Sequence, residues 1–153
     1  MATPVWAHKK RYCRFEDPIN VEFRSTKLTD IVSELVSTNW KKPGFLAADL
    51  FLHGANGCGQ PQDDQLVDGN LLRRFHVRLW TIEDGTIVAG AHEERLSGIG
   101  HEVISFEAGK EQIADAFRNG VRWRVDRDIL DLRNLTDHPH HNGSASVIEF
   151  IQR

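Results

Sequence analysis

The chain has 153 residues, of which 40% are hydrophobic and 27% charged, and its formal net charge is −3. This composition is typical of a globular domain that buries a core without disulfides, and the net negative charge disfavours nucleic acid as a partner. No apolar run approaches the roughly 18 residues that a membrane-spanning helix needs, and the N-terminus lacks the apolar segment of a secretory signal. We therefore expect a soluble, cytoplasmic protein without a membrane partner, with Cys13 and Cys58 as reduced thiols.

The N-terminal part of the chain divides into an arm, a strand and a helix. Residues 1–16 are predicted to form a basic arm, and residues 17–153 a single α+β domain. Residues 19–23 alternate between apolar and polar, as in a short strand. Apolar side chains between residues 28 and 36 then recur at the i, i+3, i+4 spacing of one helix face, so a helix is expected there, with Ser25 or Thr26 as its cap and Trp40 at its end.

A glycine-rich segment interrupts the elements that follow. Residues 45–52 are apolar almost throughout, which predicts a strand buried on both faces, and residues 53–70 are expected to form an irregular loop. No Lys-Ser or Lys-Thr follows the glycines, so a P-loop is excluded. Cys58 between two glycines, with His53 nearby, is compatible with a nucleophile but is more typical of a thiol on a loop.

The central stretch, residues 72–94, is predicted to be a β-hairpin. Its turn contains Glu83-Asp84-Gly85, and Gly85 can take the left-handed conformation that closes a three-residue loop. This loop sets a register of cross-strand pairs: Trp80 with Val88, Arg78 with Gly90, His76 with His92 and Arg74 with Glu94. The other face is then wholly apolar, which favours this register over a two-residue turn that would shift every pair by one.

The remaining elements complete an α+β pattern. After a loop at residues 95–100 we expect a strand over 101–106, a helix over 108–118, a strand over 121–125, an ambiguous, helix-like segment over 126–135, a loop over 136–143 and a strand over 146–151. The economical layout is a mostly antiparallel sheet around the central hairpin, with the two main helices packed on one face. The apolar face of the hairpin would meet those helices.

The hairpin also resembles a known family. The run Arg74-Phe75-His76-Val77-Arg78-Leu79-Trp80, followed by Val88-Ala89-Gly90-Ala91 and Gly100-His101, is similar to the LssY-like C-terminal domain, a bacterial module. The likeness extends to Asp17-Pro18-Ile19-Asn20-Val21 and to Asn39-Trp40, where Asn39 replaces a glycine, and covers about residues 17–125. The resemblance implies one domain whose functional surface lies on the hairpin. Family members often join this domain to a membrane-embedded region, an association that is not expected here, and the family brings no activity with it.

The predicted site is the polar face of the 72–94 hairpin, which we expect to bind an anionic ligand that bears phosphate or carboxylate, without a cofactor. Arginine side chains offer forked donors for such groups, Trp80 offers a stacking surface, and Gly90 leaves room for a ligand beside the backbone. His101 would reach this face if the loop at residues 95–100 folded back. The expected ligand-binding residues are Arg74, His76, Arg78, Trp80, His92, Glu94 and His101.

Three alternatives remain open. The first is a metal-dependent hydrolase, in which the opposed His76 and His92 share an ion with Glu94 or His101 and a water, although the flanking arginines disfavour a cation. The second is a protein-interaction module, with a homodimer formed through a hairpin face or the last strand. The third is an ordinary solvated sheet face, on which the arginines pair with acidic residues and the histidines with backbone carbonyls.

Overall fold

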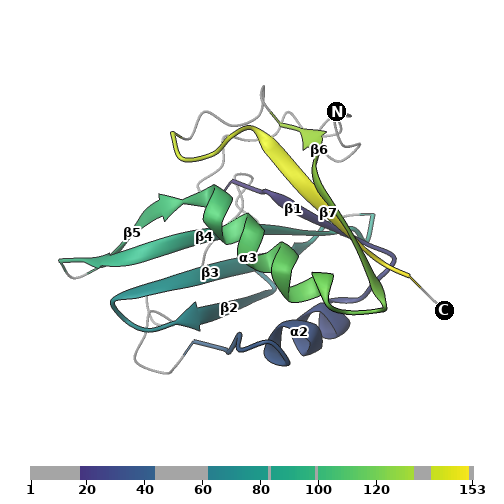
Figure 1. The fold of residues 1–153 in the computed structure, drawn as a ribbon, viewed down its shortest axis with the longest axis horizontal. Coiled ribbons are helices and arrows are strands. Elements are labelled where there is room, and N and C mark those ends of the chain that lie inside the picture. The colour runs from purple at the N-terminus through teal and green to yellow at the C-terminus, as the bar shows by residue number, and fades with distance from the viewer. Residues whose placement is uncertain (1–17, 44–61, 83, 99, 133–138, 152–153) are drawn as a thin grey trace.

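The computed structural model describes residues 18–43, 62–82, 84–98, 100–132 and 139–151 (Figure 1). Within these ranges the strands are β1 (Val21–Arg24), β2 (Asp64–Gly69), β3 (Arg73–Thr81), β4 (Ile87–Ser97), β5 (Gly100–Ser105), β6 (Trp123–Asp131) and β7 (Ser144–Phe150). The helices are α2 (Leu28–Val36) and α3 (Phe106–Arg118). The predicted first helix is therefore found, but its cap is Lys27 rather than Ser25 or Thr26, and it ends at Val36 before Trp40.

The seven strands form one sheet in the order β2-β3-β4-β1-β7-β6, and β5 pairs with β4 beside this path. The pairing of β1 with β7 is parallel, with Val21 opposite Ser146, and every other named pair is antiparallel. The sheet is thus mixed and mostly antiparallel, and with two helices in the described residues the α+β class is confirmed. Figure 1 shows α3 lying across the sheet and α2 near the edge formed by β2.

The register of the central hairpin is confirmed. Arg74 lies opposite Glu94, His76 opposite His92, and Arg78 opposite Gly90. Gly85 has a φ of 84°, and Ile82 N donates to Thr86 O over 2.9 Å, as a short loop closed by a left-handed glycine requires.

The apolar face of this hairpin belongs to the main hydrophobic core. Buried side chains from both helices and from the sheet meet in one cluster, which includes Ile31, Leu35, Val77, Leu79, Ala89, Ala91, Ile113 and Phe117. α3 packs mainly against β4, and it also contacts β3, β5, β6 and β7. Packing in this core therefore determines the position of α3, which passes next to the polar residues of β4.

Three sequence predictions were wrong. Part of the expected loop at residues 53–70 is strand β2, because pairing with β3 satisfies its backbone despite its polar composition. The helix-like segment after residue 125 continues β6, where an irregularity between Asp126 and Leu130 breaks the strand alternation and Asp128 has a φ of 54°. Most of the expected loop at residues 95–100 is taken up by the ends of β4 and β5.

Several other predictions lie outside the described residues: the basic arm over 1–16, the strand over 45–52, both cysteines, and the glycine-rich loop up to residue 61. Neither helix in the described ranges has the length and apolar character needed to cross a membrane.

Candidate functional site

The polar face of the hairpin is buried, so it is not the solvated sheet face considered among the alternatives, although Arg74 pairs with Glu94 as that alternative predicted. Arg74, His76, Arg78, His92 and Glu94 are between 2% and 8% exposed. Charged and polar groups at this depth must be paired or hydrogen-bonded, because loss of hydration is otherwise costly. We define these five residues as the polar cluster.

Two of the expected ligand contacts are replaced by protein. Trp80 is fully buried in a second hydrophobic cluster with Ile19, Val88, Leu130, Leu132 and Val147, so it offers no open stacking surface. The space beside Gly90 is filled, because a Cβ built there would lie 2.9 Å from the backbone oxygen of Pro18. The polar cluster is therefore the part of the predicted site whose side chains could still bind a ligand.

Local backbone contacts hold His92 in place. Asn20 is fully buried, and its side chain accepts from Ala91 N over 2.9 Å and donates to Ala91 O over 2.7 Å. α3 begins next to this point, with Ser105 as its cap accepting from Ala108 N. Sequence reasoning missed this role of Asn20, although a polar residue inside the predicted strand over 19–23 was a signal for it.

Helix α3 makes an unusually close approach at the same place. A Cβ built on Gly109 would lie 2.3 Å from both N and Cα of His92, so only glycine allows the helix to touch the strand there. The ring of Phe106, at the start of α3, packs edge-on against the ring of His92 with centroids 5.7 Å apart. The His92 side chain is thus positioned by packing as well as by its hydrogen bond.

Glu94 lies at the centre of the polar cluster. Arg74 Nε donates to Glu94 Oε1 over 2.5 Å, and His92 Nε2 lies 2.9 Å from Glu94 Oε2. His76 Nδ1 is 3.8 Å from the same Oε2, too far for a hydrogen bond. The two imidazole rings are perpendicular, with their centroids 5.2 Å apart.

Burial and these contacts shift two pKa values. Burial lowers the pKa of His76 from 6.5 to about 4, because loss of hydration penalises the imidazolium more than the nearby Glu94 carboxylate favours it. Burial alone would raise the pKa of Glu94, but the contacts with His76 and His92 and the charge of these groups outweigh burial and hold that pKa well below its usual range. At neutral pH the site therefore contains a neutral His76 and an ionised Glu94.

We expect the free energy of unfolding to fall as the pH is lowered from 6.5 to 4. In this window His76 takes up a proton in the unfolded chain but not in the folded one, so acid favours unfolding. The contribution is about 1.4 kcal/mol per pH unit, or about 3 kcal/mol over the window. Below pH 4.5 the lowered pKa of Glu94 adds to the loss in the same direction.

Urea unfolding at a series of pH values, on wild type and His76→Gln, measures this effect. The difference between the two profiles isolates His76 from the other histidines. We expect the variant to lose stability less steeply between pH 6.5 and 4, and identical slopes would contradict a buried, neutral His76.

The polar cluster has the donor set of a metal site. One ligand atom from each of His76, His92 and Glu94 lies within 4.8 Å of the others. Two atoms bound at about 2.1 Å to one tetrahedral zinc ion lie about 3.4 Å apart, so small side-chain rotations would bring all three into range. Neutral imidazole and carboxylate are ligand-competent forms, and the lowered pKa values provide them at His76 and Glu94.

His101 does not join the cluster. It lies on β5 opposite Leu96, and its Nε2 donates to the backbone oxygen of Leu71 over 2.9 Å. The loop at residues 95–100, which was expected to bring His101 back to the polar face, instead mostly continues the paired strands β4 and β5. Of the two third ligands considered from the sequence, the geometry therefore favours Glu94.

Helix α3 bears another buried charge, Lys110, which the sequence analysis did not predict. Lys110 is fully buried, with its Nζ 2.5 Å from Asp128 Oδ1 and 2.8 Å from Glu107 Oε2. Burial alone would raise the pKa of Asp128, but hydrogen bonds from Lys110 and Ser144 lower it. This ion pair joins α3 to the irregular part of β6, and its signal in the sequence, a lysine on the apolar side of a helix, was available.

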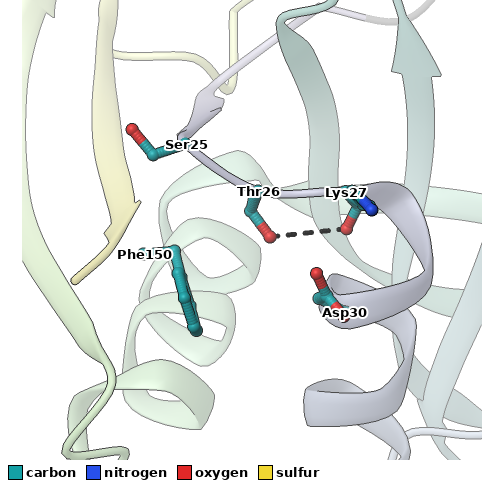
Figure 2. Close-up of a pocket in the computed structure, with 5 residues that line it drawn as sticks. All are labelled: Ser25, Thr26, Lys27, Asp30 and Phe150. Atoms are coloured by element: carbon teal, nitrogen blue, oxygen red, sulfur yellow. Dashed lines mark hydrogen bonds between the residues drawn. The ribbon is translucent and has the colours of Figure 1, made fainter. Parts of the chain in front are cut away.

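A hollow of about 560 Å³ lies between the start of α2 and the end of β7 (Figure 2). It is lined by Ser25, Thr26, Lys27, Asp30 and Phe150, and Thr26 Oγ1 donates to Lys27 O there. None of these residues belongs to the polar cluster or to the predicted site.

Comparisons with protein-family models, with curated proteins and with solved structures find no match for this chain. They therefore leave the LssY-like resemblance as a prediction from the sequence, and the candidate site rests on its own geometry.

Proposed function

We propose that the chain binds one divalent transition-metal ion through His76, His92 and Glu94, and that this ion binds an anionic ligand. The observation behind the proposal is the convergence of these three donors in a buried site. Zinc fits this set best by ligand type, because two imidazoles and one carboxylate are common zinc ligands that leave a fourth position open.

The charge of the site supports an anion in that position. An ion of charge +2 and the Arg74 guanidinium would face the single carboxylate of Glu94, so positive charge would remain in a buried place. Arg78 adds to it, since its charge contributes to the lowered pKa of His76. A phosphate or carboxylate group would balance this excess and could use the planar donors of arginine.

Hydrolysis is the chemistry that such a site would provide. A metal ion held by three protein ligands lowers the pKa of a bound water and polarises a phosphoryl or carbonyl oxygen. Arg74 would orient Glu94 through Oε1, and binding of the ion to Oε2 would replace the present contact between Oε2 and His92 Nε2. We therefore propose a metal-dependent hydrolase of anionic substrates as the enzymatic form of this function.

The proposal gives each polar residue of the R-x-H-x-R-x-W run its own role. Arg74 orients the carboxylate, His76 binds the ion and Arg78 attracts the anion, while Trp80 packs in the second hydrophobic cluster. This division of roles fits the LssY-like resemblance, which we retain as a proposal. The cytoplasmic location and the homodimer stay predictions.

Isothermal titration of untagged, chelator-stripped protein with Zn²⁺ tests the proposal. We expect one ion per chain, and an affinity at least about 100-fold lower in His76→Ala and in His92→Ala because each loses a ligand. His101→Ala is the matched control, since His101 lies outside the cluster, and it should bind zinc like wild type. Inorganic phosphate should raise the unfolding temperature of the zinc-loaded protein more than that of the stripped protein.

Absence of binding for zinc, cobalt and manganese alike in the folded wild type would overturn the metal site. A zinc affinity unchanged in both histidine variants would place the ion elsewhere. A phosphate effect of equal size with and without zinc would overturn the role of the ion in anion binding.

A further inference from the structure

Strand β2 brings one more polar side chain to the cluster. Gln65 lies opposite Arg78 in the β2–β3 ladder, diagonally next to His76, and its Oε1 is 2.9 Å from His76 Nε2. A carboxamide oxygen can only accept a hydrogen bond, so His76 Nε2 must be the donor and bear a proton.

This contact determines the tautomer of the His76 ring, and therefore whether Nδ1 is a donor or an acceptor. An imidazole that binds a metal ion through one ring nitrogen has its single ring proton on the other, and the Gln65 contact assigns that proton to Nε2. Nδ1 is then an acceptor, and it faces the ionised Oε2 of Glu94 at 3.8 Å. Two acceptors without a proton between them repel each other, whereas a cation between them would bind both.

We infer that Gln65 is a positioning residue, which fixes the ring tautomer of His76 so that Nδ1 is the metal ligand. The part of this inference that concerns metal affinity rests on the proposed function, and the part that concerns the tautomer does not. A ligating histidine commonly donates its other N–H to a neighbouring acceptor, which sets its orientation and raises its basicity. Here that acceptor comes from a different strand.

Gln65→Met tests the inference, because methionine keeps the length of the side chain and removes the acceptor. Long-range ¹H–¹⁵N spectra of the stripped protein report which ring nitrogen bears the proton, and the His76 signals are assigned by their loss in His76→Ala. We expect the Nε2–H form in wild type and a mixture of the two forms in Gln65→Met. Zinc affinity should fall about 10- to 100-fold in Gln65→Met.

Two further variants separate positioning from folding. Gln65→Glu keeps an acceptor and should retain the tautomer and the zinc affinity. Gln112→Met is the matched control, because Gln112 also makes a side-chain contact to β2, through Asp68, but lies outside the polar cluster. It should change neither readout, and unfolding temperatures of all variants show that the fold is retained.

The outcomes distinguish this inference from the metal proposal. An Nδ1–H form in wild type, or an unchanged tautomer in Gln65→Met, would overturn the role of Gln65. If the tautomer responds as expected but the wild type binds no metal, the proposed function fails and the positioning role stands. An unchanged zinc affinity despite a changed tautomer would overturn the effect of Gln65 on binding.

Discussion

Replacement of Glu94 by alanine is expected to lower the free energy of unfolding by about 3–5 kcal/mol, because it leaves the buried guanidinium of Arg74 without its carboxylate. The same change removes the acceptor of His92 Nε2, which adds an unsatisfied buried donor. Urea unfolding of stripped protein at pH 7 measures the loss, and the metal-free state separates it from any effect on zinc binding.

The neighbouring pair provides the control. Arg73 and Glu93 form an ion pair one residue away, but the Arg73 side chain is 67% exposed. Glu93→Ala should therefore cost at most about 1 kcal/mol. In the double variant Arg74→Ala/Glu94→Ala the orphaned charge is gone, so the loss should be smaller than the sum of the two single losses. Equal losses for Glu93→Ala and Glu94→Ala would contradict a buried, essential Glu94.

Gly109→Ala is expected to destabilise the chain by about 3 kcal/mol, although alanine is the better helix former. The new methyl group would overlap the backbone of His92, whose N and Cα are 2.3 Å from the Cβ position, and backbone cannot rotate away as a side chain can. The helix must then move from β4. Urea unfolding measures the loss, and we expect zinc affinity to fall as well, because His92 is displaced with its strand.

Gly100→Ala is the control for this substitution. Apart from its chain neighbours, no described residue has an atom within 4 Å of a Cβ built at Gly100, so the change should alter stability by at most about 0.5 kcal/mol. A Gly109→Ala protein as stable as wild type would show that α3 does not pack closely against the backbone of His92.

The hairpin and α2 could be predicted because their signals are local. A left-handed glycine in the turn and strict alternation determine the register of β3 and β4, and a continuous apolar stripe predicts the helix observed as α2. β2 could not be found in this way, since Asp64–Gly69 has only two buried hydrophobic residues and owes its strand conformation to the partner strand.

The sequence predicted part of the membership of the polar cluster, but it also named Trp80 and His101, which lie outside it, and it did not predict the surroundings. Facing pairs followed from register, so His76, His92 and Glu94 were named correctly as neighbours. Alternation shows which side chains share a face, but burial depends on what packs against that face, so the sequence did not reveal that these groups are buried. Gln65 was missed for the same reason as β2, because its place in the cluster depends on a distant strand pairing.

The parallel pairing of β1 with β7 has a consequence for how fast the chain folds. β1 lies between β4 and β7 in the sheet, so the strand near the beginning of the described chain must meet the strand near its end before the two halves of the sheet are joined. Closing so long a loop costs chain entropy before any contact repays it, and sheets with such distant contacts fold on the order of milliseconds to seconds. Until that step, β1 would keep an unpaired edge, and a second chain in the same state could pair with it.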